Sequence, residues 1–495
     1  MIPSYPLFIN GGFKESAHKD KIINPSTGEL LAEASLADEK DINLALVSAR
    51  AAFDEGPWRE FNLEERKEIL LKISAGIMDN AENLARLETL NTGKPIKETT
   101  FMDIPSAAKT FEHFANNLAN YLDEEIINIS ADVEARLLHE PRGVAVLIVP
   151  WNYPLLIACW KLAQALAAGN SVILKPSSLT PLTALELGRI IERAGLPKGV
   201  VNIINGEGEK LGQALCSDRR VDMISFTGSN EVGRKIMSYA SRQAKKMVME
   251  LGGKSAAIVL KDADLELAVN GSLCSIFLNQ GQMCTAMSRI LVEDDIYDDF
   301  LREFLAKLKK IKIGPGTEHE TQMGPLICLS QRKKVMAYVH KAKQEGARLL
   351  YGGKIPEAPE LKDGFFFEPA VFEEASADMG IFKEEAFGPV VCLNKFSSLQ
   401  EAVKLANSSD FALASAIWTK DDKLARELSA KINAGIIWVN TYGMFFNEVP
   451  YGGFKQSGFG KELGREGLLE YSRLKSVIID KTKGAKPLIN YWYGF

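Results

Sequence analysis

The stretch that decides the fold is VAVLIVPWNYPLLIACWKLAQALAAGNSVILKPSS, residues 144–178. Six consecutive apolar residues, 144–149, predict a buried strand. Residues 155–168 have the apolar spacing of a helix, which the pair Gly169-Asn170 ends, and residues 171–174 are strand-like again. Short apolar strands joined by a helix pair in parallel through a right-handed crossover. The stretch therefore predicts one strand–helix–strand unit of an α/β domain.

The same alternation continues along the chain. Further helices are predicted at 181–194, 210–216 and 230–240, and further strands at 200–204, 222–226 and 247–251. This order predicts an α/β fold with a doubly wound parallel sheet. Such sheets bind ligands beyond the carboxyl ends of their strands. The loops at those ends are residues 150–154, 175–178, 206–208 and 227–229.

Other segments extend this organisation. Residues 63–90 predict one long helix, with a capping box formed by Asn62 and Glu65 and with Gly93 after its end. A second α/β run follows Gly253 and extends to about residue 453. Residues 126–140 and 471–479 alternate apolar and polar side chains, so two exposed ribbons are expected to pair with each other or across subunits.

Composition and charge exclude several classes of protein. Of the 495 residues, 46% are hydrophobic and 25% are charged, which excludes a disordered, fibrous or mostly membrane-embedded chain. The net charge is −5, from 59 Lys and Arg against 64 Asp and Glu, so no overall basic field would attract nucleic acid or anionic lipid. The most apolar region, 150–170, contains Lys161 and Gln164 and fails as a membrane span.

The amino terminus and the cysteines indicate a cytoplasmic protein. Residues 1–13 have no basic segment, and two prolines interrupt their apolar stretch, so they do not resemble a signal peptide. The six cysteines show neither a pairing pattern nor zinc-ligand spacing. We expect reduced thiols in a cytoplasmic enzyme and no metal site.

Three polar residues in loops are candidates for chemistry. Cys284, in NQGQMCTAMSR (279–289), is a nucleophile or an inert buried cysteine; its ordinary pKa of about 8.5 means that activation would be needed. Glu250, in MELGGK (249–254), ends a predicted strand and is a general base or a solvated strand-end carboxylate. Asn152, in PWNYP, is a donor to an oxyanion or an ordinary turn residue.

Two familiar catalytic or binding patterns are weakly supported. None of the five histidines (18, 113, 139, 319 and 340) lies in these loops, so a Cys–His or Ser–His mechanism has little support. The glycines 206, 208 and 212 miss the dinucleotide fingerprint by one residue. Spacing alone therefore does not identify a nicotinamide cofactor.

The combination of motifs is more specific than any one of them. The chain contains, in order, PWNYP (150–154), LKPS (174–177), FTGS (226–229), ELGGK (250–254), GQMC (281–284), EEAFGPV (384–390) and PYGGFKQSGFGKELG (450–464). This set resembles the aldehyde dehydrogenase superfamily over about residues 8–477. Cys284 follows Glu250 by 34 residues, the spacing of the hydrolytic branch of that family.

The resemblance implies a thioester mechanism. The thiolate of Cys284 attacks an aldehyde, Asn152 and the backbone N–H of Cys284 hold the oxyanion, and Glu250 activates the water that hydrolyses the thioester. Lys161 and Glu462 match a proposed proton relay, with a salt bridge and a helix-face charge as the alternatives.

The resemblance also implies an NAD site. Lys175 reaches the adenosine ribose, Ser229 opens the helix that faces the pyrophosphate, Glu385 binds the nicotinamide ribose and Phe387 packs against it. The complete expected set is Pro150, Trp151, Lys175, Ser177, Ser178, Gly208, Phe226, Thr227, Gly228, Ser229, Val232, Leu251, Glu385 and Phe387. Ser178 stands where many NAD-preferring members have a glutamate that would repel a 2′-phosphate, so NADP is expected to be accepted.

The expected substrate is a small-molecule aldehyde. Tyr153 and Trp160 match aromatic positions of the betaine-aldehyde and aminoaldehyde branch, and the tail ending NYWYGF is similar to that branch. Tyr451 stands where Trp or Phe is common, and Leu278 replaces a fourth position that is often Trp. Aromatic faces attract quaternary ammonium groups. The alternatives are a broad aliphatic or aromatic aldehyde dehydrogenase, a less favoured coenzyme-A-acylating enzyme, and a catalytically silent structural relative.

Finally, the resemblance implies an organisation. Residues 1–125 and 141–252 would form the dinucleotide-binding domain, residues 253–453 the catalytic domain, and residues 126–140 and 468–495 the oligomerisation elements of a homodimer or homotetramer. Some relatives bind a structural potassium ion, but Asn91 replaces the acidic residue of that site.

Overall fold

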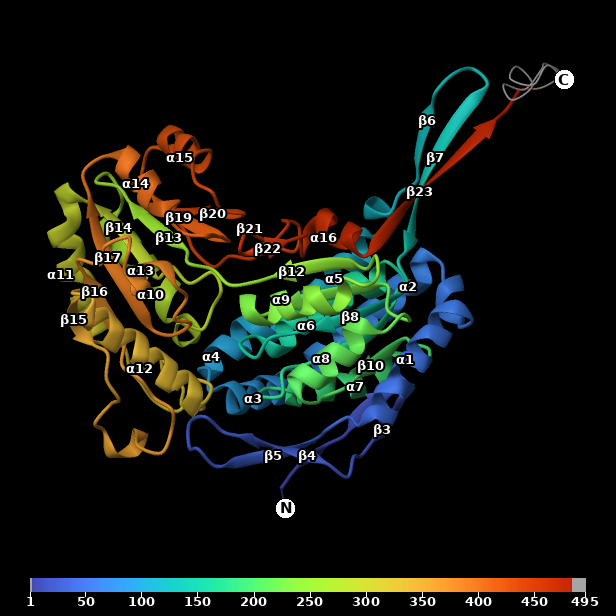
Figure 1. Ribbon diagram of the computed structural model, residues 1–495, viewed down its shortest axis with the longest axis horizontal. Coiled ribbons are helices and arrows are strands. Elements are labelled where there is room, and N and C mark those ends of the chain that lie inside the picture. The colour runs from blue at the N-terminus through green and yellow to red at the C-terminus, as the bar shows by residue number, and fades with distance from the viewer. Residues whose placement is uncertain (1, 483–495) are drawn as a thin grey trace.

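The computed structural model describes residues 2–482, in which two α/β lobes lie side by side and a narrow β-ribbon projects from one of them (Figure 1). The sheet of the first lobe has the strand order β22-β12-β11-β8-β9-β10-β2-β3. These strands are β2 (Leu7–Ile9), β3 (Gly12–Lys14), β8 (Val144–Ile148), β9 (Ser171–Lys175), β10 (Val201–Ile203), β11 (Met223–Thr227), β12 (Lys246–Glu250) and β22 (Gly458–Phe459).

The centre of this sheet is parallel, as the sequence predicts. Strands β12, β11, β8, β9 and β10 all pair in parallel, whereas β22, β2 and β3 add antiparallel edges from distant parts of the chain. The helices of this lobe are α1 (Glu39–Asp54), α2 (Leu63–Asp79), α3 (Ala81–Thr92), α4 (Ile96–Glu98), α5 (Ile104–Tyr121), α6 (Pro154–Ala167), α7 (Leu182–Ala194), α8 (Gly208–Ser217), α9 (Asn230–Ala240) and α16 (Gly464–Glu470).

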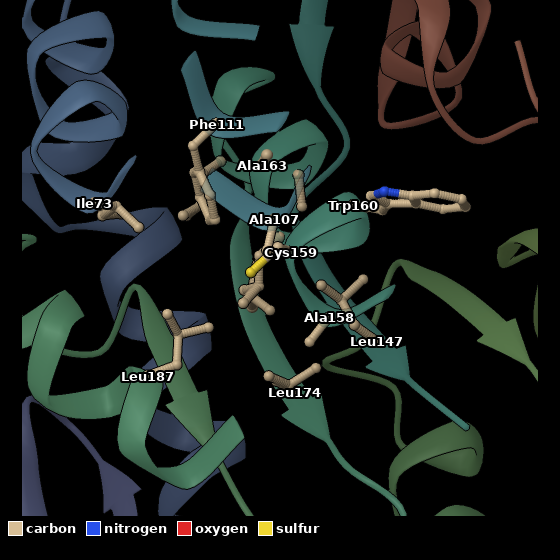
Figure 2. Packing of buried hydrophobic residues seen from close by; sticks show 14 of the residues in the cluster. Ile73, Ala107, Phe111, Leu147, Ala158, Cys159, Trp160, Ala163, Leu174 and Leu187 are labelled. Atoms are coloured by element: carbon tan, nitrogen blue, oxygen red, sulfur yellow. The ribbon is translucent and has the colours of Figure 1, made fainter. Parts of the chain in front are cut away.

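Both faces of the parallel strands are covered. In β8, Ala145 and Leu147 pack with α2, α5, α6 and α7, while Val146 packs with α1, α8 and α9. Figure 2 shows the core on the α6 side of the sheet, where Cys159 and Ala163 lie among the other apolar residues and Trp160 points to another side of the helix. Because both faces are buried, these strands are continuously apolar rather than alternating.

The prediction of one long helix over residues 63–90 is wrong, because the structure has two helices there. The capping box exists, since Asn62 and Glu65 each accept the other's backbone N–H, and Gly93 has a left-handed φ of 81° at the predicted end. However, the chain breaks into α2 and α3 at Asn80. The Asn80 side chain donates to the carbonyl of Gly76 at 2.7 Å, a local hydrogen bond that competes with helix continuation.

The second lobe follows the predicted α/β run. Its sheet has the order β15-β16-β17-β14-β13-β19-β20, parallel except for β15. The strands are β13 (Ala256–Val259), β14 (Arg289–Glu293), β15 (Arg348–Gly352), β16 (Ala370–Glu373), β17 (Val390–Phe396), β19 (Ala414–Trp418) and β20 (Ile436–Val439). The helices are α10 (Leu265–Phe277), α11 (Tyr297–Leu308), α12 (Leu329–Gln344), α13 (Gly380–Lys383), α14 (Leu399–Ala406) and α15 (Asp422–Ser429).

The two alternating segments pair with each other within the chain. Strands β6 (Glu125–Asn128), β7 (Val133–Pro141) and β23 (Ser472–Asp480) form the projecting antiparallel ribbon, with β7 in the middle (Figure 1).

Smaller elements complete the described chain: β1 (Ser4–Tyr5), β4 (Lys19–Ile23), β5 (Leu30–Ser35), β18 (Phe411–Ala412), β21 (Phe454–Lys455), and short 3-10 or π turns at Pro57–Glu60, Thr99–Asp103, Leu278–Gly281, Asp294–Ile296 and Pro359–Leu361. The tail motif NYWYGF lies outside the described residues.

Two further findings concern membranes and cysteines. Within residues 2–482, no helix is both long and apolar enough to cross a bilayer. All six cysteines are free thiols.

Candidate active site

Cys284 follows a strained turn. Helix α10 ends at Phe277, and Asn279, Gln280 and Gly281 then adopt left-handed φ angles of 46°, 57° and 71°. Left-handed backbone is costly for residues other than glycine and persists where surrounding contacts hold it. On the other side, Gly253 allows a close approach, because a Cβ there would lie 2.1 Å from the carbonyl oxygen of Cys284. The turn after β12 and the turn before Cys284 are thus packed together.

Cys284 is half-buried and lines the cavity described below. Its Sγ lies 3.1 Å from the hydroxyl oxygen of Tyr451. Burial raises the pKa of Cys284 to about 12, and the hydrogen bond with Tyr451 acts in the opposite direction. At neutral pH the thiol is protonated in this state, so a base is needed for it to react.

In addition to burial, the charge of Glu250 acts on Cys284 and helps to raise the pKa of that thiol. Glu250 ends β12 and is only 3% exposed, yet neither of its carboxylate oxygens has a hydrogen-bond partner within the described residues. A Cβ at Gly452 would come within 2.5 Å of Glu250 Oε1, so the carboxylate lies against the backbone next to Tyr451. Burial, and then the charge of Glu462, raise the pKa of Glu250 well above its usual value. A buried carboxyl with a raised pKa and free oxygens has the properties of a general base.

Asn152 is fixed next to the same turn. Its side-chain Nδ2 donates to the carbonyl of Gln282 at 2.8 Å, and Asn279 Nδ2 donates to the carbonyl of Asn152 at 3.0 Å. One N–H of the Asn152 amide is therefore occupied, whereas an amide carries two. The second N–H is the one available for an oxyanion.

Lys161 and Glu462 form a closed, buried ion pair. Lys161 Nζ lies 2.6 Å from Glu462 Oε1 and 2.7 Å from the hydroxyl of Ser225, and Gln164 donates to the other oxygen of Glu462 at 2.7 Å. The salt bridge that the sequence left as an alternative is thus present. Their relay role stays a prediction.

A cavity of about 540 Å³ lies between the two lobes at the carboxyl ends of the parallel strands. Every residue of the expected cofactor set lines it, and Asn152 and Cys284 line its inner end. The structure adds lining residues that the sequence analysis missed, among them Tyr239, Gln331 and Lys334. Gln331 and Lys334 lie on α12, in the second lobe, and no local pattern distinguishes them from the polar face of a surface helix.

The walls of the cavity are rigidly held. Ser229 caps α9 by accepting the N–H of Val232, and Gly228, Ser229 and Val232, at the start of this helix, line the cavity. Helix N-termini of this kind favour phosphate. Lys175 is also buried there, and burial lowers its pKa to about 8.

Glu385 and Phe387 enter from the second lobe. Glu385 accepts the backbone N–H of Gly253 at 2.9 Å, and burial raises its pKa to about 7. The ring of Phe387 meets that of Trp151 edge to face, with centroids 5.1 Å apart. These contacts tie the second lobe to the strand-end loops of the first.

The predicted aromatic positions are only partly assembled. Trp160 and Tyr451 lie 5.2 Å apart, and Phe445, which the sequence analysis missed, packs against both at 5.9 and 5.7 Å. Tyr153 has one ring face covered by Lys94 Nζ at 3.3 Å. Leu278 lines a separate apolar recess with Phe101, Met102, Leu273, Cys274 and Phe277.

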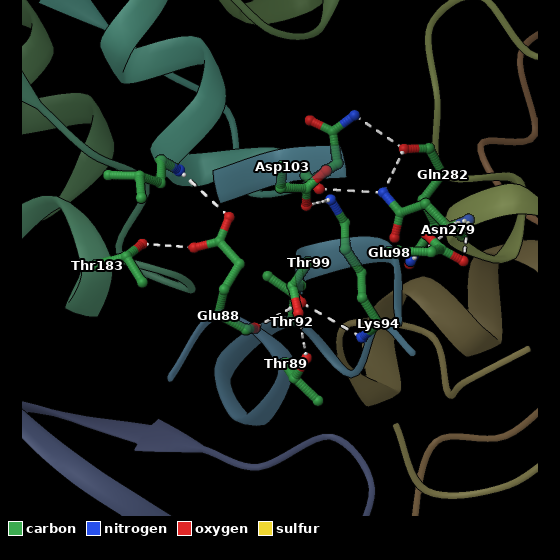
Figure 3. A network of polar contacts seen from close by, with 12 residues as sticks. Glu88, Thr89, Thr92, Lys94, Glu98, Thr99, Asp103, Thr183, Asn279 and Gln282 are labelled. Atoms are coloured by element: carbon green, nitrogen blue, oxygen red, sulfur yellow. Dashed lines mark hydrogen bonds and ion pairs between the residues drawn. The ribbon is translucent and has the colours of Figure 1, made fainter. Parts of the chain in front are cut away.

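A buried polar network supports the turn of residues 279–281 that precedes Cys284 (Figure 3). Glu98 accepts the backbone N–H of Asn279 at 3.1 Å, and Lys94 pairs with Asp103 at 2.6 Å. Nearby, Glu88 accepts from the hydroxyl of Thr183 at 2.6 Å. The network joins α3, α4 and α5 to the loop that carries Cys284, and no sequence motif indicated it.

The described residues contain no group of three or more His, Cys, Asp or Glu side chains arranged to hold a metal ion. At the position considered for potassium, Asn91 Nδ2 donates to the carbonyl of Leu179 at 2.9 Å.

The comparisons with known proteins agree with this arrangement. A family model described as the aldehyde dehydrogenase family matches residues 13–477. Betaine aldehyde dehydrogenase of Bacillus subtilis (strain 168) is 45% identical over 494 residues, 99% of each chain. A betaine aldehyde dehydrogenase structure from Staphylococcus aureus in complex with NAD+ matches with a TM-score of 0.95 at 41% identity, covering 99% of this chain and 96% of that one.

The NAD+ complex of an aldehyde dehydrogenase from Bacillus cereus matches with a TM-score of 0.94 at 38% identity, covering 97% of both chains. These matches, together with the doubly wound fold, identify the chain as an enzyme of the oxidoreductase class. The chain belongs to the aldehyde dehydrogenase family, which confirms the resemblance seen in the sequence.

Proposed function

We propose that this enzyme oxidises an aldehyde to its carboxylic acid through a thioester on Cys284, with NAD+ as the hydride acceptor. The observation that carries the proposal is that Cys284 and Asn152 line one cavity, while the carboxylate of Glu250, which has no hydrogen-bond partner within the described residues, lies against Gly452, next to the Tyr451 that contacts Cys284. Three side chains from separate segments would not converge there by local sequence preference.

The residues divide the chemistry between them. Glu250 takes the proton of Cys284, the sulfur bonds to the carbonyl carbon, and the carbonyl electron pair moves to oxygen, where Asn152 and the backbone N–H of Cys284 donate to it. NAD+, when bound, supplies the hydride acceptor for the oxidation. Glu250 then removes a proton from water as the water attacks the thioester, the C–S bond breaks, and Cys284 leaves as a thiolate.

The cavity fits a dinucleotide on chemical grounds. It offers a helix N-terminus at Ser229 for phosphate, Lys175 for a ribose and Glu385 for the second ribose. The two matched structures from Staphylococcus aureus and Bacillus cereus are NAD+ complexes, which supports the same cofactor here.

For the substrate we propose betaine aldehyde or a related aminoaldehyde. The support is the 45% identity to a betaine aldehyde dehydrogenase and the aromatic group of Trp160, Phe445 and Tyr451 beside Cys284. Cation–π attraction of about 0.5–2 kcal/mol per ring favours a quaternary ammonium. The alternative is a broad specificity for aliphatic or aromatic aldehydes. It is favoured by Leu278, which stands at a fourth position where relatives that bind betaine aldehyde often have Trp. Comparing kcat/KM for betaine aldehyde, aminobutyraldehyde, a straight-chain aldehyde and benzaldehyde separates them.

The mechanism is tested by two substitutions. Cys284→Ala removes the nucleophile and should abolish turnover. Glu250→Gln keeps the shape but can take a proton neither from Cys284 nor from water, so at most one burst of NADH, slower to form, should precede a stalled acyl-enzyme. Rapid-mixing absorbance measures both. Sustained turnover by Cys284→Ala would refute the thioester scheme, while absence of any absorbance change in the unmodified protein would favour a silent homologue.

We also propose that NADP+ is accepted. Ser178 lines the cavity, and a hydroxyl there lacks the charge that would repel a 2′-phosphate. Ser178→Glu should therefore lower kcat/KM for NADP+ by about tenfold or more, because repulsion between the new carboxylate and the 2′-phosphate would cost about 1.4 kcal/mol. The value of kcat/KM for NAD+, which has no 2′-phosphate, should change little. Steady-state kinetics with both cofactors provides the check. A value for NADP+ a hundredfold below that for NAD+ in the unmodified enzyme would contradict the proposal.

The organisation and location follow the same reasoning. We propose that residues 1–125 and 141–252 form the dinucleotide-binding domain, residues 253–453 the catalytic domain, and residues 126–140 and 468–495 the oligomerisation elements of a homodimer or homotetramer. Ile126, Ile127, Leu474 and Ile478 are exposed on the projecting ribbon, which is unfavourable for an isolated chain. Six free thiols are consistent with a cytoplasmic location.

A further inference from the structure

Tyr451 contacts the reacting atom. The hydroxyl oxygen of Tyr451 lies 3.1 Å from Cys284 Sγ, and it is the one side-chain partner found for that sulfur among residues 2–482. Tyr451 is 7% exposed, so water does not compete strongly for its hydroxyl. The amide of Asn152, by contrast, is directed at a backbone carbonyl. The geometry therefore gives a tyrosine, and not the amide, the direct contact with the nucleophile.

We propose that Tyr451 is a catalytic residue whose hydroxyl donates a hydrogen bond to the Cys284 thiolate, both when the thiolate forms and when it departs from the thioester. This inference rests on the proposed function, because it assumes that Cys284 is the nucleophile. It gives Tyr451 a polar role in addition to the aromatic contact with substrate.

The direction of the hydrogen bond follows from the charges. A thiolate carries no proton, so in that state the bond runs from the tyrosine oxygen to sulfur. Burial, together with the charges of Cys284 and Glu250, raises the pKa of Tyr451 well above its usual value. The phenol therefore keeps its proton when Cys284 loses one. The proton of Cys284 passes to Glu250 and not to Tyr451.

The position of the hydroxyl is well defined. Trp160 and Phe445 contact the Tyr451 ring edge to face at 5.2 and 5.7 Å. The Tyr451 backbone is held by two hydrogen bonds with Glu462, of 2.6 and 2.8 Å, and the carboxylate of Glu462 is itself fixed by Lys161 and Gln164. Because Gly452 lies against Glu250, the same backbone segment touches both the nucleophile and the proposed base.

The proton and bond changes are consistent with this role. When the C–S bond forms, sulfur loses its negative charge and becomes a weak acceptor, which frees the hydroxyl. When water has added to the thioester and the C–S bond breaks, the departing sulfur regains the charge and the hydroxyl donates to it again. The tyrosine is neither consumed nor deprotonated over the cycle.

The test is Tyr451→Phe, which removes one oxygen and keeps the ring. The rate of iodoacetamide alkylation is measured against pH in the cofactor-free protein, following the Cys284 peptide by mass spectrometry because Cys274 and Cys328 are also accessible. We expect alkylation below the thiol pKa to fall about tenfold, the effect of a one-unit rise in that pKa. The value of kcat/KM should fall while the Kd for NAD+ is unchanged.

Tyr442→Phe is the matched control. Tyr442 is also buried, and its hydroxyl lies 3.3 Å from that of Thr285, the residue after Cys284, without contacting the sulfur. Its pH profile of alkylation should match that of the unmodified protein. An equal loss in both variants would mean general loosening of the turn and would overturn the inference.

A second variant covers the case in which Tyr451→Phe does not fold. Site-specific replacement of Tyr451 by 3-fluorotyrosine makes the phenol a stronger donor, and alkylation at low pH should then be faster. Faster alkylation in Tyr451→Phe would instead show that the hydroxyl holds the thiol in an unreactive position, which contradicts the proposal. If Tyr451→Phe changes nothing while Cys284→Ala is inactive, this inference fails and the proposed function stands.

Discussion

At the scale of single residues, burial shifts the ionisation of the side chains at the candidate site. Burial raises the pKa of Cys284 to about 12 and that of Glu385 to about 7, and both oxygens of Glu250 lack a hydrogen-bond partner within the described residues. An unpaired buried carboxylate is costly, and such costs are retained mainly at functional sites. A solvated cysteine would be more ionised at neutral pH, so the raised pKa of Cys284 is the reason that a base such as Glu250 is needed.

Glu98 provides a pH test at this scale. Burial raises its pKa to about 8, against the opposing charge of Lys94 and with the reinforcing charge of Asp103. A carboxyl with a raised pKa binds more protons in the folded state, so its contribution to stability is present at low pH and is lost as the pH rises from about 4.5 to about 8.

Glu98→Gln should therefore reduce the fall in Tm between pH 5 and pH 8 relative to the unmodified protein, because an amide does not titrate. The amide oxygen can still accept the N–H of Asn279, which keeps the turn in place. Calorimetry at several pH values measures the effect. Parallel Tm curves for the two proteins would show that Glu98 does not titrate in this range.

At the scale of elements, a buried ion pair joins the helices that contact the turn before Cys284. Lys94, after α3, and Asp103, at the start of α5, are both fully buried and lie 2.6 Å apart. Glu98, between them in the chain, anchors Asn279 in its left-handed conformation. The strained turn that presents Cys284 thus depends on helices that precede it by some 180 residues.

Breaking this pair should destabilise the enzyme strongly. Asp103→Leu leaves the Lys94 ammonium buried without its closest partner, a change that typically costs about 3–5 kcal/mol. The double variant Lys94→Met/Asp103→Leu removes both charges and should recover most of that loss. Urea unfolding midpoints compare the three proteins. A double variant no more stable than Asp103→Leu would contradict this account.

At the scale of the whole molecule, function requires both lobes. The cavity takes Ser177, Ser178 and Ser229 from the first lobe and Cys284, Glu385 and Phe387 from the second. Strand β22 carries the chain back into the first sheet, so residues near the carboxyl end bring Tyr451 and Glu462 to the site. The ribbon projects away from this site, which suits it to contact between subunits.

The exposed apolar side chains of the projecting ribbon lead to a prediction about the association of subunits. Leu474 and Ile478 lie on one face of β23 and are 58% and 70% exposed. The double variant Leu474→Asp/Ile478→Asp should lower the mass in solution, because charges at a packed contact prevent association. Lys475→Ala, on the opposite face, serves as the control. Light scattering measures the mass, and an unchanged mass would exclude this face as the subunit contact.

Local patterns in the sequence determined much of the architecture. The apolar strand at 144–148, the helix at 154–167 and the parallel centre of the first sheet all follow from hydrophobic periodicity, which depends on neighbouring residues. The ordered motifs also identified the family and selected the residues that line the cavity. The break at Asn80 and the antiparallel edges were missed, because they depend on a single side-chain contact and on distant strands.

Only the tertiary structure decided which residues meet. The contact of Cys284 with Tyr451 joins positions 167 residues apart, and the pairing of Lys161 with Glu462 joins positions 301 apart. Such contacts, and the burial that shifts the pKa of Glu250, arise from the packing of whole layers and leave no local periodicity to detect. Periodicity fixes which face of an element is buried, while the chain path fixes what that face is buried against.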